Sequence, residues 1–313
     1  MNGLFHLVVF ASGLILLIKG ADLVTDHAAA VARRSGISQL IIGITLVAAS
    51  TSLPELAVSL FSAITNTAQI ATGTIIGSNI ANIGMVLGIS ALTVPLFSSR
   101  EFLREVYGML AFTSVLSFLL LWGLVWYEGI VLLSGFFLYN FYLFRSRPKK
   151  TIRSVITSRL RRRFTKSRPG VHLLFVASGS VLVILGANML VTSTINIAEW
   201  LGVPELVIAL IVIAIGTSLP EFVTSFVAAL KKMRAISIGN IVGSNIFNTA
   251  ILGMASLFRT VPATPSVVFV DIPAMILLSV MLFIFMRTGW KISRLEGAIM
   301  LMVYLIFIYL QFL

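Results

Sequence analysis

The chain has 313 residues, of which 58% are hydrophobic and only 11% charged, and its mean hydropathy is +1.04. Soluble domains are about half apolar and about a quarter charged, so this composition indicates a polytopic helical membrane protein. The absence of cysteine excludes disulfides, thiolate metal sites and cysteine nucleophiles. The net charge of +12 does not indicate nucleic-acid binding, because 11 of the 23 basic residues lie in one segment between apolar regions, Arg145–Arg168.

Ten candidate membrane spans follow one another along the chain. Each is an apolar run near the length of about 20 residues that crosses a bilayer. The predicted limits are 4–32, 38–64, 70–94, 105–124, 128–144, 171–198, 204–230, 236–258, 267–286 and 295–312. The first run lacks a basic n-region and a small-residue cleavage site, so we expect a spanning helix rather than a signal peptide. The sequence therefore predicts an all-α polytopic membrane protein with ten transmembrane helices.

Basic residues concentrate in alternate loops between these spans. The loops that follow spans one, three, five, seven and nine hold 21 of the 23 lysines and arginines, whereas the opposite set holds only Arg259. Because cytoplasmic loops are enriched in Lys and Arg, this asymmetry places both termini outside and the central basic loop in the cytoplasm. We therefore expect a multi-pass protein of the cell (plasma) membrane.

The two halves of the chain are related by an internal repeat. A shift of 166 residues aligns Gly20–Asn82 with Gly186–Asn248 and gives 22 identities in 63 ungapped positions. The identities include Thr, Ser, Pro, Glu, Gly and Asn, which apolar composition alone would not align. Each half holds five spans, an odd number, so the second must cross the membrane in the opposite sense. We predict an N-terminal five-helix repeat (1–144), a basic cytoplasmic linker (145–170) and an inverted C-terminal five-helix repeat (171–313).

Each repeat carries the same unusual motif inside an apolar run, TSLPEL at Thr51–Leu56 and TSLPEF at Thr217–Phe222. A proline lacks the amide N–H and clashes with the carbonyl four residues earlier, so both helices should kink and release backbone carbonyls. In hydrocarbon such carbonyls must face protein, water or an ion. The motif therefore predicts free carbonyl oxygens near residues 48–50 and 214–216.

The glutamate of each motif, Glu55 or Glu221, is the main indication of function. A charge at the bilayer centre costs roughly 2.5–3.5 kcal/mol, and such residues usually face a cavity and serve transport. A structural glutamate paired with lysine is the alternative, but Lys19 is the one lysine expected inside the membrane and could not pair with both. Asp22 and Asp26 lie near Lys19, where we expect a local Lys–Asp pair. We therefore interpret Glu55 and Glu221 as ion ligands.

Hydroxyl and amide side chains accompany both glutamates. Threonine and serine lie four and three residues before each glutamate, on the same helix face. Serine and asparagine follow on the next span in the repeated sequence GSNIxN. The residues are Thr51, Ser52, Ser78, Asn79 and Asn82 in the first repeat and Thr217, Ser218, Ser244, Asn245 and Asn248 in the second. Hydrogen bonding between helices is the alternative role for the serines and asparagines.

The chemistry of these donors indicates the kind of ion. They include no thiolate and no imidazole, which disfavours Zn²⁺ and Cu⁺ and favours Ca²⁺, Na⁺ or Mg²⁺. Ca²⁺ accepts about six to eight oxygens in flexible geometry, whereas Mg²⁺ requires a tight octahedron and keeps its water. A cage of carboxylates, hydroxyls, amides and bare carbonyls suits Ca²⁺ best.

Glycine pairs at GxxxG spacing occur in both repeats. They are Gly73 with Gly77 and Gly239 with Gly243. Small residues at this spacing allow helix backbones to approach closely. We therefore interpret these glycines as packing residues that bring the ligand-bearing helices together.

The two motifs together resemble a known family. GITLVAASTSLPE…GTIIGSNIAN and ALIVIAIGTSLPE…GNIVGSNIFN look like the two α-repeats of the calcium/cation antiporter superfamily, specifically those of prokaryotic Na⁺/Ca²⁺ exchangers. The resemblance covers essentially the whole chain. It implies ten helices in an inverted 5+5 arrangement, a cluster of cation sites, and exchange of Ca²⁺ for Na⁺ by alternating access. The first and sixth spans resemble the long paired helices that slide against the rest during exchange.

The resemblance also implies roles for individual residues. Glu55 and Glu221 would be the central Ca²⁺ ligands, shared with Na⁺. The other implied ligands are the hydroxyls of Thr51, Ser52, Thr217, Ser218, Ser78 and Ser244, the amides of Asn82 and Asn248, and the carbonyls of Ala48 and Ala214. Some family members carry Asp where this chain has Asn248, so the site here has only two acids. That difference leaves the stoichiometry and the Na⁺ selectivity open.

Other functions remain open at this point. A Ca²⁺/H⁺ or other cation/Ca²⁺ antiporter is the runner-up, although proton-coupled members carry further acids in these helices. A passive channel would also fit polar midplane residues. An intramembrane hydrolase using Ser52 or Ser218 is disfavoured, because neither serine has a His or Lys base in its motif. We expect no enzymatic activity, no cofactor besides the transported Ca²⁺ and Na⁺, and contact with membrane lipid; a monomer is compatible with the sequence.

Overall fold

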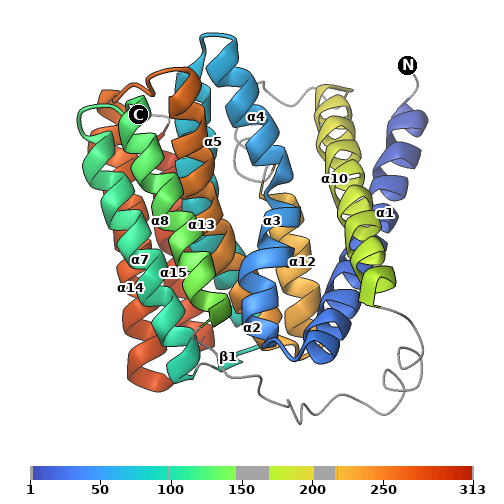
Figure 1. Ribbon diagram of the computed structural model, residues 1–313. Coiled ribbons are helices and arrows are strands. Elements are labelled where there is room, and N and C mark those ends of the chain that lie inside the picture. The colour runs from blue at the N-terminus through green and yellow to red at the C-terminus, as the bar shows by residue number, and fades with distance from the viewer. Residues whose placement is uncertain (1–2, 98, 146–168, 201–215, 217, 312–313) are drawn as a thin grey trace.

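The computed structural model describes residues 3–97, 99–145, 169–200, 216 and 218–311 (Figure 1). Helices dominate the described ranges, and three short π-helical segments and two short strands accompany them. The α-helices are α1 (Gly3–Ser35), α2 (Gln39–Ile42), α3 (Ala48–Thr51), α4 (Leu53–Ile64), α5 (Ala68–Ala81), α6 (Gly88–Thr93), α7 (Arg100–Leu120), α8 (Trp126–Arg145), α10 (Pro169–Trp200), α12 (Leu219–Leu230), α13 (Arg234–Phe258), α14 (Ile272–Gly289) and α15 (Arg294–Leu310). The π-helical segments are η1 (Gly43–Val47), η2 (Asn82–Leu87) and η3 (Val267–Asp271), and the strands are β1 (Leu96–Phe97) and β2 (Lys291–Ile292).

The helices coincide with the predicted spans wherever the chain is described. Seven helical segments are long and apolar enough to cross a membrane, and the bent pair Gln39–Thr51 and Leu53–Ile64 makes an eighth. The predicted span 204–230 is described only at residue 216 and from residue 218 onward, because 201–215 and 217 lie outside the described residues. A helical protein with several membrane spans is therefore confirmed, and the count of ten stays a prediction.

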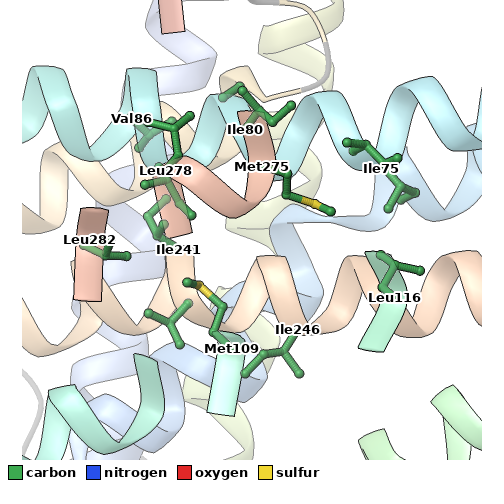
Figure 2. Packing of buried hydrophobic residues seen from close by; sticks show 14 of the residues in the cluster. Ile75, Ile80, Val86, Met109, Leu116, Ile241, Ile246, Met275, Leu278 and Leu282 are labelled. Atoms are coloured by element: carbon green, nitrogen blue, oxygen red, sulfur yellow. The ribbon is translucent and has the colours of Figure 1, made fainter. Parts of the chain in front are cut away.

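Two helical segments form the centre of the molecule. In the most apolar 18-residue stretch of each candidate span, 83% of the residues are buried for span 68–93 and 78% for span 234–258, against 39% or less for the other single-helix spans. Around them packs one large apolar cluster. Figure 2 shows part of it, with Ile75 and Ile80 of α5, Ile241 and Ile246 of α13, Met109 and Leu116 of α7, Val86 of η2, and Met275, Leu278 and Leu282 of α14. The two segments that carry GSNIxN are thus the most enclosed parts of the protein.

Helices α1 and α10, the predicted first and sixth spans, lie side by side at one edge of the molecule (Figure 1). Their backbones approach closely, since a Cβ placed on Gly20 would come within 2.7 Å of the Gly179 carbonyl oxygen. A small separate apolar cluster, which includes Leu17 and Val183, fills the contact. The pair therefore packs largely through its own interface, beside the main core.

The glycine pair of the second repeat packs as predicted. A Cβ on Gly243 would lie 2.2 Å from the Ile44 carbonyl oxygen, and one on Gly239 would lie 2.8 Å from that of Leu40. Helix α13 therefore rests directly on the α2–η1 backbone. By the repeat, Gly73 and Gly77 would meet residues near 206 and 210, which lie outside the described residues, so their packing role stays a prediction.

The acidic side chains of α1 pair differently from the sequence prediction. Lys231, at the end of α12, lies 2.9 Å from Asp22 Oδ1 and 2.8 Å from Asp26 Oδ1. Helix α12 packs against α1, which brings the Lys231 ammonium between the two carboxylates. The Lys19 side of α1 is exposed. The expected pairing of these aspartates with Lys19 is therefore wrong, because packing between distant segments supplies a better-placed cation.

Two short backbone pairings join loops at opposite ends of α7. Before α7, β1 pairs antiparallel with β2, with Leu96 opposite Ile292. After α7, Leu124 and Val261 exchange backbone hydrogen bonds of 2.8 and 2.9 Å. The first pairing joins two of the basic-rich loops and the second joins two of the basic-poor loops. Loops assigned to the same side by charge therefore do lie together.

Candidate functional site

The first TSLPE motif forms a break between two helices. Helix α3 ends at Thr51 and α4 begins at Leu53, and the bent pair of helical segments that meets there turns by 51°. Ser52 at the junction has φ −85° and ψ 15°, outside regular helical geometry. Pro54 in the first turn of α4 lacks the N–H that would otherwise bond to the Ser50 carbonyl. The predicted kink is confirmed in this repeat.

The second motif has the same local geometry where it is described. Ser218 precedes α12 with φ −86° and ψ 4°, and Pro220 stands in the first turn of that helix. Both α4 and α12 have 12 residues, and their first turns carry the motif glutamates. Two predicted site residues, Ala214 and Thr217, lie outside the described residues. The described parts of both motifs therefore place a carboxylate in the first turn of a helix.

Glu55 and Glu221 are both completely buried, with 0% of their surface exposed. Each stands at the N-terminal end of its helix, where the helix dipole favours a negative charge. Lys231 pairs with the aspartates of α1, and within the described ranges neither glutamate forms an ion pair. The interpretation of these glutamates as structural partners of lysine therefore has no support in the described part of the chain.

Hydrogen bonds link the two repeats at the carboxylates. The Ser52 hydroxyl donates to Glu221 Oε1 at 2.9 Å, and the Ser78 hydroxyl donates to Glu55 Oε1 at 3.3 Å. The Ser218 hydroxyl donates in turn to Ser78 Oγ at 3.3 Å. The serine that precedes α4 and the serine that precedes α12 thus each contact a residue of the opposite repeat, and the described site residues form one cluster.

The four asparagines of the two GSNIxN sequences form two pairs that the repeat interchanges. Asn82 Nδ2 donates to Asn245 Oδ1 at 3.0 Å, and Asn248 Nδ2 donates to Asn79 Oδ1 at 3.0 Å. All four side chains are buried. Hydrogen bonding between helices, the alternative considered from the sequence, is therefore present for every one of them.

Four buried carboxylate and amide oxygens of this cluster accept no hydrogen bond from any described residue. They are Oε2 of Glu55, Oε2 of Glu221, Oδ1 of Asn82 and Oδ1 of Asn248. A buried acceptor without a partner costs roughly 1–3 kcal/mol, and more when it is charged, so such atoms are rare unless water or an ion satisfies them. Carboxylate and amide oxygens are the donors that Ca²⁺ prefers. The donor set therefore fits a hard cation.

Three further predicted residues lie around the cluster. The Thr51 hydroxyl is 3.2 Å from the Ala48 carbonyl oxygen, which also accepts the Ser52 amide N–H at 3.0 Å. The Ala48 carbonyl, predicted to be released by the kink, is thus hydrogen-bonded, because the α3 turn closes on it before the break. Ser244 is completely buried, and its hydroxyl oxygen also has no hydrogen-bond partner among the described residues.

Two polar residues next to the site were missed from the sequence. Asn240 Oδ1 lies 3.2 Å from the Thr51 hydroxyl, and Asn240 Nδ2 donates to Ser225 Oγ at 2.9 Å. Both residues are fully buried. Helical spacing is the signal that could have found them, because Asn240 stands four residues before Ser244 and Ser225 four residues after Glu221.

The fold and the site define a class of protein. Several apolar helices surround two buried carboxylates and neutral oxygens, an arrangement that membrane transporters use for cations. Within the described ranges no three His, Cys, Asp or Glu side chains come together as a metal cluster, so the site does not resemble a zinc centre. The chain belongs to the sodium/calcium exchanger protein family, whose model matches residues 5–145 and 171–313.

Individual relatives agree with this membership. The chain is 31% identical to the sodium/calcium exchanger MaX1 of Methanosarcina acetivorans, over 98% of each chain. It is 34% identical to the inner membrane protein YrbG of Escherichia coli, over 91% of this chain and 89% of that protein. Among solved structures, the sodium-calcium exchanger NCX_Mj soaked with zero Na⁺ and Ca²⁺ matches with a TM-score of 0.85 and 30% identity, over 99% and 100% of the two chains.

Proposed function

We propose that this protein exchanges Ca²⁺ for Na⁺ across the membrane by alternating access, and that both ions bind in turn at the cluster around Glu55 and Glu221. The observation that carries the proposal is the pair of fully buried carboxylates, each with one oxygen that has no partner among the described residues. Membership of the sodium/calcium exchanger family supports Na⁺ as the counter-ion.

The proposed ligands combine two charges with many neutral oxygens. The Glu55 and Glu221 carboxylates balance the charge of one Ca²⁺. A hydroxyl that donates its proton to a carboxylate keeps lone pairs for a cation, so Ser52 can serve both partners. Ser78 also donates to a carboxylate, but it accepts from Ser218 and Asn248, so a cation bound there would replace one of these two hydrogen bonds. The full set consists of the side chains of Glu55, Glu221, Asn82, Asn248, Thr51, Ser52, Thr217, Ser218, Ser78 and Ser244 and the carbonyl groups of Ala48 and Ala214.

Ten transmembrane helices in two inverted repeats are part of the proposal. The repeat maps the β1–β2 contact of Leu96 with Ile292 onto positions 262 and 126, one or two residues from the observed contact of Val261 with Leu124. These two contacts lie at opposite ends of α7, as an inverted repeat requires. Their correspondence supports two halves that cross the membrane in opposite senses and can exchange conformations.

The division of the chain and its orientation are proposed on separate grounds. The family match leaves out residues 146–170, which supports a linker between an N-terminal repeat, 1–144, and a C-terminal repeat, 171–313. The basic-rich loops face the cytoplasm and both termini face outward in the cell membrane, following the charge asymmetry. The exposed apolar side chains of the outer helices contact lipid.

Exchange with Na⁺ is favoured over exchange with H⁺. The described site holds two acidic residues and no third, whereas proton-coupled antiporters of the superfamily carry further acids in these helices. The charge balance is a separate consequence: several Na⁺ in place of one Ca²⁺ would leave net positive charge on the site. Transport would then move charge across the membrane. The family points to the same coupling, and the Ca²⁺/H⁺ alternative is not favoured.

Purified protein in liposomes tests the proposal with separate Na⁺, K⁺ and H⁺ gradients. We expect an outward Na⁺ gradient to drive uptake of radioactive Ca²⁺, and the K⁺ and H⁺ gradients to drive little. Uptake that ignores Na⁺ and follows the pH gradient would establish proton coupling instead. A Ca²⁺ leak that needs no counter-ion would identify a channel.

A further inference from the structure

We propose that Asn245 and Asn79 are positioning residues that decide which end of Asn82 and Asn248 faces the cation. The inference rests on the proposed function, because it concerns how the same site presents its neutral oxygens. An asparagine amide has an oxygen that binds a cation and an NH₂ group of similar size that does not. Its orientation therefore decides whether the residue is a ligand at all.

A backbone carbonyl sets the orientation of Asn82 through Asn245. The Asn79 carbonyl oxygen can only accept, so the atom of Asn245 that lies 3.3 Å from it must be the donor Nδ2. Asn245 Oδ1 then faces Asn82, which must turn its own Nδ2 toward it, at 3.0 Å. Asn82 Oδ1 is thereby directed away from this contact, and it has no partner among the described residues.

The Met275 thioether sets the orientation of Asn248 through Asn79. Met275 Sδ can accept weakly and has no hydrogen to donate, so the Asn79 atom that lies 3.7 Å from it is Nδ2. Asn79 Oδ1 accordingly accepts from Asn248 Nδ2 at 3.0 Å, and that NH₂ group also donates to Ser78 Oγ at 3.3 Å. Asn248 Oδ1 is again the buried atom without a described partner.

The two arrangements differ in strength. A carbonyl oxygen accepts a hydrogen bond more strongly than a thioether sulfur does, so Asn245 is held more firmly than Asn79. Loss of Asn245 should therefore affect the site more than loss of Asn79. A divalent ion also gains more than a monovalent ion from an oriented amide dipole, because the interaction scales with the ion charge. The positioning should favour Ca²⁺ over Na⁺.

A double-mutant cycle tests the role of Asn245. A carboxylate presents oxygen at both ends, so in Asn82→Asp the orientation of the side chain no longer matters. In the native background we expect Asn245→Leu to raise the dissociation constant for Ca²⁺ about tenfold, the effect of one lost buried hydrogen bond. In the Asn82→Asp background the same substitution should change it less than about twofold. Calorimetric titration of the purified protein with Ca²⁺ measures all four variants.

A matched substitution away from the site controls for the loss of an asparagine. Asn140 of α8 donates to the Phe136 carbonyl oxygen within its own helix, and Asn140→Leu should leave the Ca²⁺ dissociation constant unchanged. The same factor for Asn245→Leu in both backgrounds would overturn the proposal and assign Asn245 to packing alone. If Asn245→Leu does not fold, Asn245→Ala in the two backgrounds decides by the same criterion.

The binding measurement separates this inference from the proposed function. A native protein that binds Ca²⁺ and shows the predicted cycle, yet takes up no Ca²⁺ against a Na⁺ gradient, would disprove the exchange and retain the positioning role. Na⁺-driven uptake together with equal factors in both backgrounds would retain the exchange and disprove the positioning. Absence of Ca²⁺ binding by the native protein would overturn both.

Discussion

The hydroxyl of Ser52 in the first repeat donates a 2.9 Å hydrogen bond to the Glu221 carboxylate of the second. Both residues are fully buried, and Ser52 is the residue at which α3 gives way to α4. The backbone break of one repeat therefore places a donor against the charge of the other. This hydrogen bond joins the two repeats within the site, so a substitution in either motif should alter the geometry of the carboxylate or hydroxyl in the other.

Ser52→Ala tests this contact. A hydrogen bond to a charged group contributes about 1.5–3 kcal/mol, so we expect Ca²⁺ binding to weaken by about tenfold or more. Titration of the purified variant with Ca²⁺ measures the change. Ser178→Ala is the control, because the exposed Ser178 hydroxyl bonds only within α10 among its described contacts. Unchanged Ca²⁺ binding in Ser52→Ala would contradict a role of this hydroxyl at the site.

Glu55→Gln and Glu221→Gln should each abolish Na⁺-driven Ca²⁺ uptake while the protein still inserts in the membrane. One remaining carboxylate does not balance Ca²⁺, and the ion would have to enter a buried site with net charge. Ca²⁺ should also stop raising the melting temperature, because stabilisation by a ligand requires binding to the folded state.

The cation-free proteins provide a second readout for these glutamate variants. Burial of a neutral amide costs less than burial of a carboxylate, so neither variant should be less stable than the native protein without Ca²⁺. Glu128→Gln, in the first turn of α8 outside both motifs, is the control and should keep its transport activity. Native-like flux in Glu55→Gln or Glu221→Gln would refute the assignment of the site.

Gly243→Ala tests the packing of α13 on η1. The new Cβ would lie 2.2 Å from the Ile44 carbonyl oxygen and 2.5 Å from Ile44 Cα, so backbone must move. Overpacking of this kind costs typically about 1–3 kcal/mol, and the melting temperature should fall. Gly135→Ala on α8 is the control, because its Cβ would meet only two Phe112 ring carbons, at 3.6 and 3.8 Å. Equal melting temperatures for the two variants would disagree with the close approach.

Lys231→Met tests the ion pairs between α12 and α1. The Lys231 side chain is 25% exposed and those of Asp22 and Asp26 are 39% and 23% exposed, so water screens the pairs. We expect a loss of about 1 kcal/mol or less, which shrinks further at high salt. Thermal unfolding at low and high ionic strength measures it, with the exposed Lys291→Met as control. A loss of stability that salt does not alter would argue against an ionic contribution.

Much of the site was predictable because the chemistry of the motif is local. Pro54 breaks its helix whatever surrounds it, and a buried Glu55 is too costly to stand in a membrane without a function. Because the two halves align with a shift of 166 residues, each ligand role inferred for a residue of one repeat also applied to its counterpart in the other. Positive charge in alternate loops likewise predicted which loops lie together, as the contact of Leu96 with Ile292 illustrates.

What the sequence by itself determined is therefore the helical membrane class, the kink and the residues that bear charge or oxygen, since these follow from residue type and spacing. Only the tertiary structure decided the partners. Lys231 rather than Lys19 reaches Asp22, and Asn245 rather than a neighbour in sequence holds Asn82. Such contacts join residues more than 160 positions apart, and packing of whole helices sets them, which no local pattern encodes.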